Sequence, residues 1–286
     1  MAKLPSEFTF IERGYFNGNN ILIEGTGRPV IVDTGHFLSR DETLALIRQH
    51  GVEPETLEMI VSTHCHSDHH GANRLLKAIS GAPIGLGALT ARWFAENEQR
   101  LTWFDQIAQE VDIALADITF EHGDEITLSG LPFQVIGLPG HAPDCVGFYQ
   151  PDTKLLISAD ALWANDLGVL NVEVHGWGIV EDAALALSRI KALDVEMAIP
   201  GHGGLIFDVD AAIEQIERRL ERFRQSPETV GQHLTRRFLM YELLCVQPIE
   251  RDKMIDLIET DGWIYTYLPY LDRQLEATPR SVSLVV

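Results

Sequence analysis

The stretch Thr63-His64-Cys65-His66-Ser67-Asp68-His69-His70-Gly71 directly follows a short apolar run, Met59 to Val61. The apolar run predicts a buried strand that ends where the histidines begin. Imidazoles and carboxylates are costly to crowd together unless a cation compensates them. The stretch therefore predicts a metal site at the end of a strand.

Three later segments repeat this arrangement of an apolar run followed by a side chain that binds metals. They end at His141, Asp160 and His202. His64 and His66 are two residues apart, so they project to the same side of an extended backbone. Asp68 and His69 lie past the strand, where a turn can bring them to a second metal position. We expect these strand ends to converge on one rim of a sheet.

Two metals held by histidine and carboxylate indicate metal-assisted hydrolysis. Paired ions lie about 3.5–4 Å apart, hold a water or hydroxide between them and lower the pKa of that water toward ~7. They also polarise the carbonyl or phosphoryl group under attack. Asp160 is suited to bridge two ions because its carboxylate has two oxygens.

The charge of the chain limits its partners. Its 286 residues include 22 Lys and Arg against 42 Asp and Glu, a formal net charge of -20. Such a field repels nucleic acids and anionic membrane surfaces, so we expect neither as a partner. It does not exclude an anionic small-molecule substrate, because a bound dication reverses the sign of the local electrostatic potential.

The cysteines and the apolar runs indicate a compartment. Cys65, Cys145 and Cys245 are too few for a disulfide framework and fit a reducing environment. No signal-peptide core and no membrane-length apolar run is present. We therefore expect a soluble, cytoplasmic protein, in which Cys65 and Cys145 are small buried side chains.

Strands and helices alternate along most of the chain. Strands are expected at 21–24, 29–33, 58–62, 118–120, 125–128, 133–137, 147–149, 155–158 and 196–200, and helices at 41–50, 71–79, 181–193 and 210–225. Residues 88–118 are expected to be a long helical insertion, whose aromatics either fill the core or wall a substrate pocket. Ser226-Pro227 marks a boundary, followed by three or four helices and a terminal strand at 281–286.

The combined motifs resemble those of the metallo-β-lactamase-fold hydrolase superfamily. His-x-His-x-Asp-His, Pro-Gly-His141, Asp160 and Pro-Gly-His202 occur in the order of that family, over roughly residues 8–208. The resemblance implies an α/β fold, an αββα sandwich of two mixed β-sheets flanked by helices. We assign this domain to residues 1–225 and a small helical C-terminal domain to residues 226–286.

The resemblance also implies a ligand set. One metal would be held by His64, His66 and His141, and the other by Asp68, His69 and His202. Asp160 would bridge the two. The metals in such proteins are usually zinc, with iron or manganese also found. Asp33, in the early Val-Asp-Thr-Gly motif, is expected to anchor a ligand rather than to bind metal.

Within the superfamily the chain most resembles the glyoxalase-II-like and LACTB-2-like hydrolases. True β-lactamases fit less well, because zinc lactamases generally lack an Asp at the position of Asp160. The lactonases of the family often carry a Tyr where Trp163 stands. The C-terminal helices resemble those of the LACTB-2-like endoribonuclease group, but residues 226–286 hold six Lys and Arg against nine Asp and Glu, a net charge of -3 that disfavours RNA.

These features predict a dinuclear, metal-dependent hydrolase that cleaves an ester, thioester or lactone with a metal-bound hydroxide. Asp68 and Asp160 are the predicted catalytic carboxylates. Trp163, His175 and Trp177 are candidates for the substrate pocket. His70 is expected to face solvent or to hydrogen-bond near a ligand.

Two other functions remain open at this point. A single iron held by His64, His141 and Asp160 would resemble the sulfur (persulfide) dioxygenases. The C-terminal helices would alternatively make the chain a non-enzymatic partner-binding protein with a residual metal site, or a homodimer.

Overall fold

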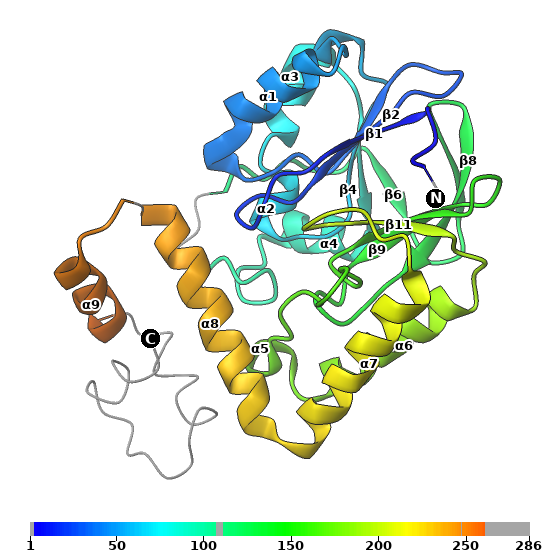
Figure 1. Ribbon diagram of the computed structural model, residues 1–286. Coiled ribbons are helices and arrows are strands. Elements are labelled where there is room, and N and C mark those ends of the chain that lie inside the picture. The colour runs from blue at the N-terminus through cyan, green and yellow to red at the C-terminus, as the bar shows by residue number, and fades with distance from the viewer. Residues whose placement is uncertain (1–2, 107–110, 247, 261–286) are drawn as a thin grey trace.

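Two mixed β-sheets pack face to face and helices cover their outer faces (Figure 1), as the predicted αββα sandwich requires. The computed structural model describes residues 3–106, 111–246 and 248–260. Within these ranges, none of the helices combines the length and the apolar character needed to cross a membrane.

The first sheet contains the N-terminal strands in sequence order. These are β1 (Phe8–Ile11), β2 (Asn20–Ile23), β3 (Val30–Val32), β4 (Met59–Ser62), β5 (Ile84–Gly87) and β6 (Ile118–Phe120). Strands β1 to β3 pair antiparallel, whereas β3 to β6 pair parallel. The parallel strands point their carboxyl ends to the same edge of the sheet, and β4 delivers the histidine-rich stretch there.

The second sheet has the order β11-β10-β9-β8-β7. Its strands are β7 (Glu125–Leu128), β8 (Leu131–Gly137), β9 (Val146–Gln150), β10 (Leu155–Ala159) and β11 (Met197–Pro200). All neighbours pair antiparallel except β10 and β11, which are parallel. Strands β8, β10 and β11 therefore run in the same direction and end at the same edge.

The core between the sheets consists of β-branched and aromatic side chains. Phe148 of β9 is fully buried, and its ring meets that of Phe120 edge-on at 5.8 Å. Val32 and Val61 of the first sheet belong to the same cluster. Residues that alternate along each strand point to this layer, while the intervening ones face the helices.

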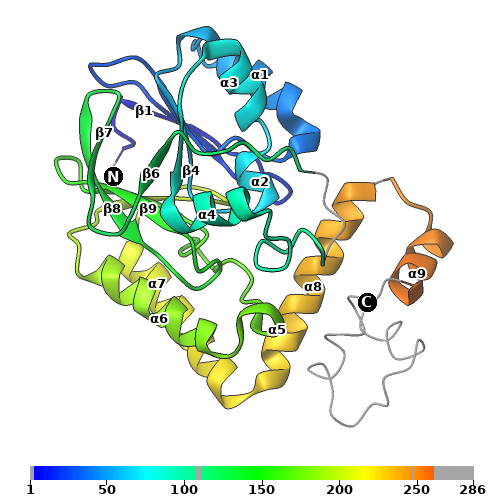
Figure 2. The same cartoon turned by 180° about the vertical axis from the view of Figure 1, so that it is seen from behind.

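The helices form two outer layers on opposite sides of the sandwich in both views (Figures 1 and 2). α1 (Arg40–Gln49), α3 (Asn73–Ser80) and α4 (Ala88–Glu96) contribute Ile47, Leu76 and Trp93 to the cluster over the first sheet. α6 (Gly178–Lys191) and α7 (Val209–Gln225) contribute Leu187 and Ile213 to the cluster over the second sheet. The short α2 (Ser67–His70) and α5 (Val172–His175) complete the set in the described part of the first 225 residues.

The C-terminal part begins with α8 (Pro227–Val246), a long helix that follows α7 after the single residue Ser226, and continues with α9 (Arg251–Thr260). The predicted boundary coincides with this turn. However, Val230, Leu234 and Phe238 of α8 join the cluster over the second sheet. The division into two domains stays a prediction, and α8 packs directly on the sandwich.

The predicted long helical insertion at 88–118 is wrong in its extent. Only α4 is helical among the described residues of this segment, and residues 97–106 form turns. Asn97 ends α4 in the left-handed region at φ 54°, and Trp103 adopts φ 64°, which a continuing helix does not allow. The terminal strand predicted at 281–286, and the helices predicted beyond residue 260, lie outside the described residues.

Replacement of Phe148 by Ala is expected to lower the free energy of unfolding by about 3–5 kcal/mol, because it removes a ring at the centre of the inter-sheet core. Phe207→Ala is the matched control, since that ring is 53% exposed. It should change the free energy of unfolding by less than about 0.5 kcal/mol. Denaturant titration measures both, and equal effects would contradict the assignment of the core.

Candidate metal centre

The polar side chains that follow four strands meet at the edge shared by the two sheets. The histidine-rich stretch comes from β4 of the first sheet, whereas His141, Asp160 and His202 follow β8, β10 and β11 of the second. The expected convergence is therefore found, but on the edges of two sheets rather than on one rim of one sheet. All of these side chains are buried except Asp68, which is partly exposed.

Two groups of ligand atoms correspond to the two predicted metal sets. His64, His66 and His141 place one nitrogen each within 4.8 Å of the others. Asp68, His69 and His202 do the same with two nitrogens and a carboxylate oxygen. His66 Nδ1 lies 2.7 Å from His141 Nε2, and His202 Nε2 lies 3.1 Å from Asp68 Oδ2.

Asp160 lies between these groups. Its Oδ2 is 3.4 Å from His141 Nε2 and 3.6 Å from His202 Nε2, so one oxygen faces both sets. Its Oδ1 is 3.7 Å from His69 Nε2 and accepts a hydrogen bond from Trp163 Nε1 at 3.2 Å. This position suits a carboxylate that bridges two cations.

The rear nitrogen of each of three imidazoles is held by an oxygen. His69 Nδ1 lies 2.7 Å from Asp33 Oδ2, His141 Nδ1 lies 2.8 Å from Val169 O, and His202 Nδ1 lies 3.0 Å from Gly14 O. Such contacts fix the ring so that Nε2 points into the site. Asp33 also accepts hydrogen bonds from the backbone N–H and the hydroxyl of Thr63, and its role as an anchor of a metal ligand stays a prediction.

The donor set fits divalent cations. Nε2 of His64 and of His69 is buried and has no hydrogen-bond partner in the described part of the chain. Buried polar atoms are nearly always satisfied, so these nitrogens are in place for a ligand bond instead. Imidazole and carboxylate together are the ligands that zinc, iron and manganese accept.

Glycines let the backbone approach two of these side chains closely. A Cβ at Gly201 would overlap Asp160 Oδ1, and a Cβ at Gly168 would overlap the ring of His141. Ala159, directly before Asp160, adopts φ 49° at an irregularity of the β10–β11 pairing. The backbone is strained where it aims the carboxylate, which is common at functional sites.

Two histidines of the site are neutral, and its central carboxylate is ionised. Burial lowers the pKa of His64 and of His66 well below the usual value, and neighbouring histidines add to the effect. These imidazoles are neutral at pH 7 and offer a lone pair. Burial acts against ionisation of Asp160, but His202 and His69 outweigh it and hold the pKa of that carboxyl well below its usual range. Lone pairs and negative charge therefore face the same space.

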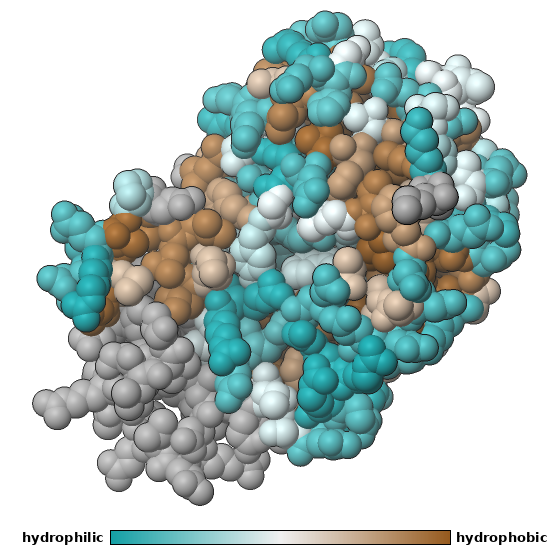
Figure 3. All heavy atoms as spheres, viewed as in Figure 1, coloured by the Kyte–Doolittle hydropathy of each residue, from teal (hydrophilic) through white to brown (hydrophobic). Residues whose placement is uncertain are grey.

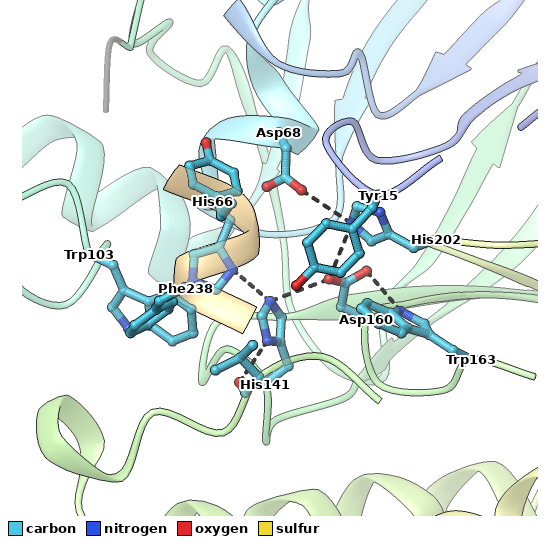
Figure 4. A pocket seen from close by; sticks show the side chains of 11 residues that line it. Tyr15, His66, Asp68, Trp103, His141, Asp160, Trp163, His202 and Phe238 are labelled. Atoms are coloured by element: carbon cyan, nitrogen blue, oxygen red, sulfur yellow. Dashed lines mark hydrogen bonds and ion pairs between the residues drawn. The ribbon is translucent and has the colours of Figure 1, made fainter. Parts of the chain in front are cut away.

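A cavity opens over this cluster (Figure 4), with a volume of about 510 Å³ including its mouth. His66, Asp68, His141, Asp160 and His202 form its polar floor. Its walls are mostly apolar and aromatic, and they consist of Tyr15, Trp103, Trp163, Val169, Phe238 and Tyr241. Neither Lys nor Arg occurs among the eleven described residues that line it.

The three predicted pocket residues have different positions. Trp163 lines the cavity and touches Asp160. His175 lies behind the wall, where its Nε2 accepts a hydrogen bond from Trp103 Nε1 at 3.0 Å. Trp177 is 43% exposed directly before α6 and is not among the described residues that line this cavity.

His70, Cys65 and Cys145 are all buried. His70 is buried, with its ring 4.9 Å from that of Phe94, so the solvent-facing alternative is wrong. Cys65 and Cys145 are both buried, as expected of small core side chains.

The sequence pattern does not point to the cavity residues that come from distant segments. Tyr15 precedes the first polar turn, and Phe238 and Tyr241 lie on α8. Tyr241 Oη is 2.9 Å from Ser67 Oγ, so α8 contacts the helix that carries Asp68. These aromatics carry no motif, and only their helical spacing of three residues marks Phe238 and Tyr241 as one face.

Similarity to known proteins extends over most of the chain. Residues 13–202 match the family model described as the metallo-beta-lactamase superfamily. A hydroxyacylglutathione hydrolase of Pseudomonas putida (strain W619) is 31% identical over 184 residues, which are 62% of this chain and 59% of that protein. A beta-lactamase-like protein 2 homolog of Caenorhabditis elegans is 25% identical over 80% of this chain and 69% of its own length. The chain thus matches less than two thirds of the Pseudomonas protein.

The fold has close counterparts among solved structures. The crystal structure of a metallo-beta-lactamase family protein from Thermus thermophilus superposes with a TM-score of 0.67 at 21% identity. The match covers 85% of this chain and 92% of that one. At this identity the likeness concerns the fold alone.

Replacement of Asp33 by Ala is expected to weaken metal binding about 10- to 100-fold, because His69 loses the carboxylate that orients it. Metal content after dialysis against a graded chelator series measures the change. Asp152→Ala, on an exposed turn, is the control and should retain metal like the unaltered protein. Equal retention by both variants would show that Asp33 does not support the site.

Proposed function

The chain belongs to the metallo-beta-lactamase superfamily, and from this we propose that it is a metal-dependent hydrolase with two divalent cations, most readily zinc. The bond that it cleaves is an ester, a thioester or a lactone. The observation that carries the proposal is the arrangement of two three-ligand groups on either side of Asp160. His202 of the second group faces the same carboxylate oxygen as His141 of the first.

The roles of the ligands follow from their positions. His64, His66 and His141 hold one cation, and Asp68, His69 and His202 hold the other, with Asp160 in common. When bound, the cations would act as Lewis acids and lower the pKa of a water molecule. Asp68 is the one partly exposed carboxylate of the floor, so it is placed both to bind a cation and to accept a proton from the attacking water.

Two phenols supply neutral hydrogen-bond donors beside this floor. Tyr15 and Tyr241 line the cavity, and burial raises the pKa of each above its usual value. Both hydroxyls therefore keep their protons at pH 7. We infer that these hydroxyls orient the carbonyl oxygen of the substrate. Trp163 is less suited to this role, because its indole N–H already donates to Asp160.

The walls indicate what kind of substrate fits. Trp103, Trp163 and Phe238 present flat apolar surfaces, and aromatic walls favour apolar or aromatic acyl groups. Glutathione carries two carboxylates, and the described lining of this cavity offers them no cation. We therefore propose a substrate whose acyl group is small and apolar, although relatives of this chain are hydroxyacylglutathione hydrolases.

Purification with metal quantification, followed by a panel of substrates, tests the proposal. Two zinc ions per chain and hydrolysis of thioesters, esters or lactones are expected. One iron per chain with oxygen consumption on persulfides would instead identify the sulfur dioxygenase. Absence of turnover on every substrate, with metal bound, would favour the partner-binding alternative.

Replacement of Asp160 by Ala is expected to remove at least one metal and nearly all turnover, because both ligand groups lose the carboxylate between them. Metal content and kcat measure this. A variant that keeps two metals and full activity would contradict the bridging role. Asp166→Ala, at an Asp outside the ligand groups, is expected to retain both metals.

Replacement of Phe238 by Ala is expected to raise KM for an apolar acyl thioester several-fold while leaving the metal content unchanged. The ring forms part of the wall, where it meets the ring of Trp103 edge-on, and it is not a candidate ligand, so chemistry at the floor should persist. Met240→Ala, whose side chain is 50% exposed on the same helix, is the control. A fall in kcat with unchanged KM would contradict a role in substrate binding.

A further inference from the structure

A second cavity lies at the corner where α7 turns into α8, outside the metal centre. It encloses about 660 Å³ including its mouth. α7 supplies Arg219, Arg222 and Phe223, α8 supplies Thr229, Gln232, His233, Arg236 and Arg237, and the segment after β10 supplies Asp166. The surface over this corner is strongly hydrophilic (Figure 3).

The charge of this cavity opposes that of the whole chain. Four arginines and one aspartate line it, whereas the chain as a whole has a net charge of -20. Asp166 pairs with two of the arginines, with Oδ1 at 2.7 Å from Arg219 and Oδ2 in contact with Arg237. Arg222 and Arg236 form no ion pair within the part of the chain that the structure describes.

Neutral polar groups join the arginines. His233 is 9% exposed, lines the cavity, and its Nε2 has no hydrogen-bond partner in the described residues. Burial lowers the pKa of His233 to about 4, so the ring is neutral at pH 7. Gln232 adds an amide to the same lining.

We propose that this cavity binds a phosphate-type oxyanion. Four guanidinium groups around one carboxylate leave an excess of positive charge in the cavity, which attracts anions. The guanidinium fork matches the oxygens of phosphate in pairs, and such charge-assisted hydrogen bonds are the strong ones. The unpartnered nitrogen of His233 is a buried polar group that a bound oxyanion would satisfy, either directly or through water.

The cavity lies close to the metal centre, with a third cavity adjacent to both. A third cavity shares Asp166 and Arg237 with it, and shares Tyr15, Trp163 and His202 with the cavity over the metal site. The guanidinium of Arg237 lies 5.1 Å from the ring centre of Tyr15 and 5.2 Å from that of Trp163. The oxyanion therefore has two sources open to it, the distal phosphate of a long substrate and a separate phosphate-bearing molecule.

Calorimetric titration of the zinc-loaded protein with inorganic phosphate, at constant ionic strength in chloride, tests the site. Arg222→Ala and Arg236→Ala are each expected to weaken phosphate binding about 10-fold, the loss typical of one charge-assisted hydrogen bond. Arg218→Ala, an exposed arginine of α7 that pairs with Glu214, is the matched control and should bind as the unaltered protein does. Phosphate held by the metal ions is common to all four proteins and cancels in the comparison.

Equal phosphate affinity in all four proteins would overturn the proposal, because it would assign all binding to the metal ions. Equal weakening by Arg218→Ala would overturn it too, since it would reduce the effect to general surface charge. Arg222 and Arg236 are exposed, so circular dichroism and melting temperature should match those of the unaltered protein.

A second measurement assigns the source of the oxyanion and rests on the proposed hydrolase activity. The same acyl group is offered as a coenzyme A thioester, which carries phosphates, and as an N-acetylcysteamine thioester, which carries none. If the oxyanion belongs to the substrate, Arg222→Ala lowers kcat/KM about 10-fold for the first thioester alone. If it is a separate molecule, both values stay unchanged while phosphate binding is weakened. Failure of the hydrolase proposal would abolish turnover of both thioesters and leave the phosphate titration intact.

Discussion

Burial of imidazoles and carboxylates at one point is the constraint on which the rest of this molecule depends. Such a cluster is unstable in an apolar interior unless positive charge compensates it. The two sheets are arranged so that their carboxyl edges meet, and each edge supplies part of the cluster. Oxygens of Asp33, Val169 and Gly14 hold Nδ1 of three rings, so that Nε2 of each ring points into the site. The fold thus positions a set of lone pairs and charges that fits divalent cations.

The chemistry and the walls of the site come from different parts of the chain. The candidate ligands all follow strands of the sandwich, whereas two of the aromatic walls belong to α8. The hydrogen bond between Tyr241 and Ser67 joins α8 to the segment of Asp68. Helix α8 therefore forms one unit with the site, even though its first residue marks the predicted boundary between domains. Assembly into a homodimer remains a prediction.

Most of the sandwich and the candidate ligand set could be predicted from the sequence, because apolar runs end in side chains of metal-binding types at His64, His141, Asp160 and His202. Local patterns carry that information. The course of residues 97–106 could not be predicted, since aromatic content is compatible with helix and with turns, and the positive φ of Trp103 decides between them. Tyr15 and Tyr241 could not be placed either, because only tertiary packing brings such distant residues to one cavity. The arginines at the turn between α7 and α8 have the pattern of an ordinary solvated helix face, and only the return of α8 gathers them around one cavity.

The position of α8 separates two kinds of sequence change. Phe238 and Tyr241 line the cavity and are not candidate ligands, so substitutions on this face of α8 are expected to alter the shape of the cavity. At the strand ends the backbone approaches the candidate ligands closely and hydrogen bonds are buried, so substitutions there are expected to disturb the ligand geometry. A change of substrate is therefore expected to require substitutions on α8, whereas a change of reaction chemistry is expected to require substitutions at the strand ends.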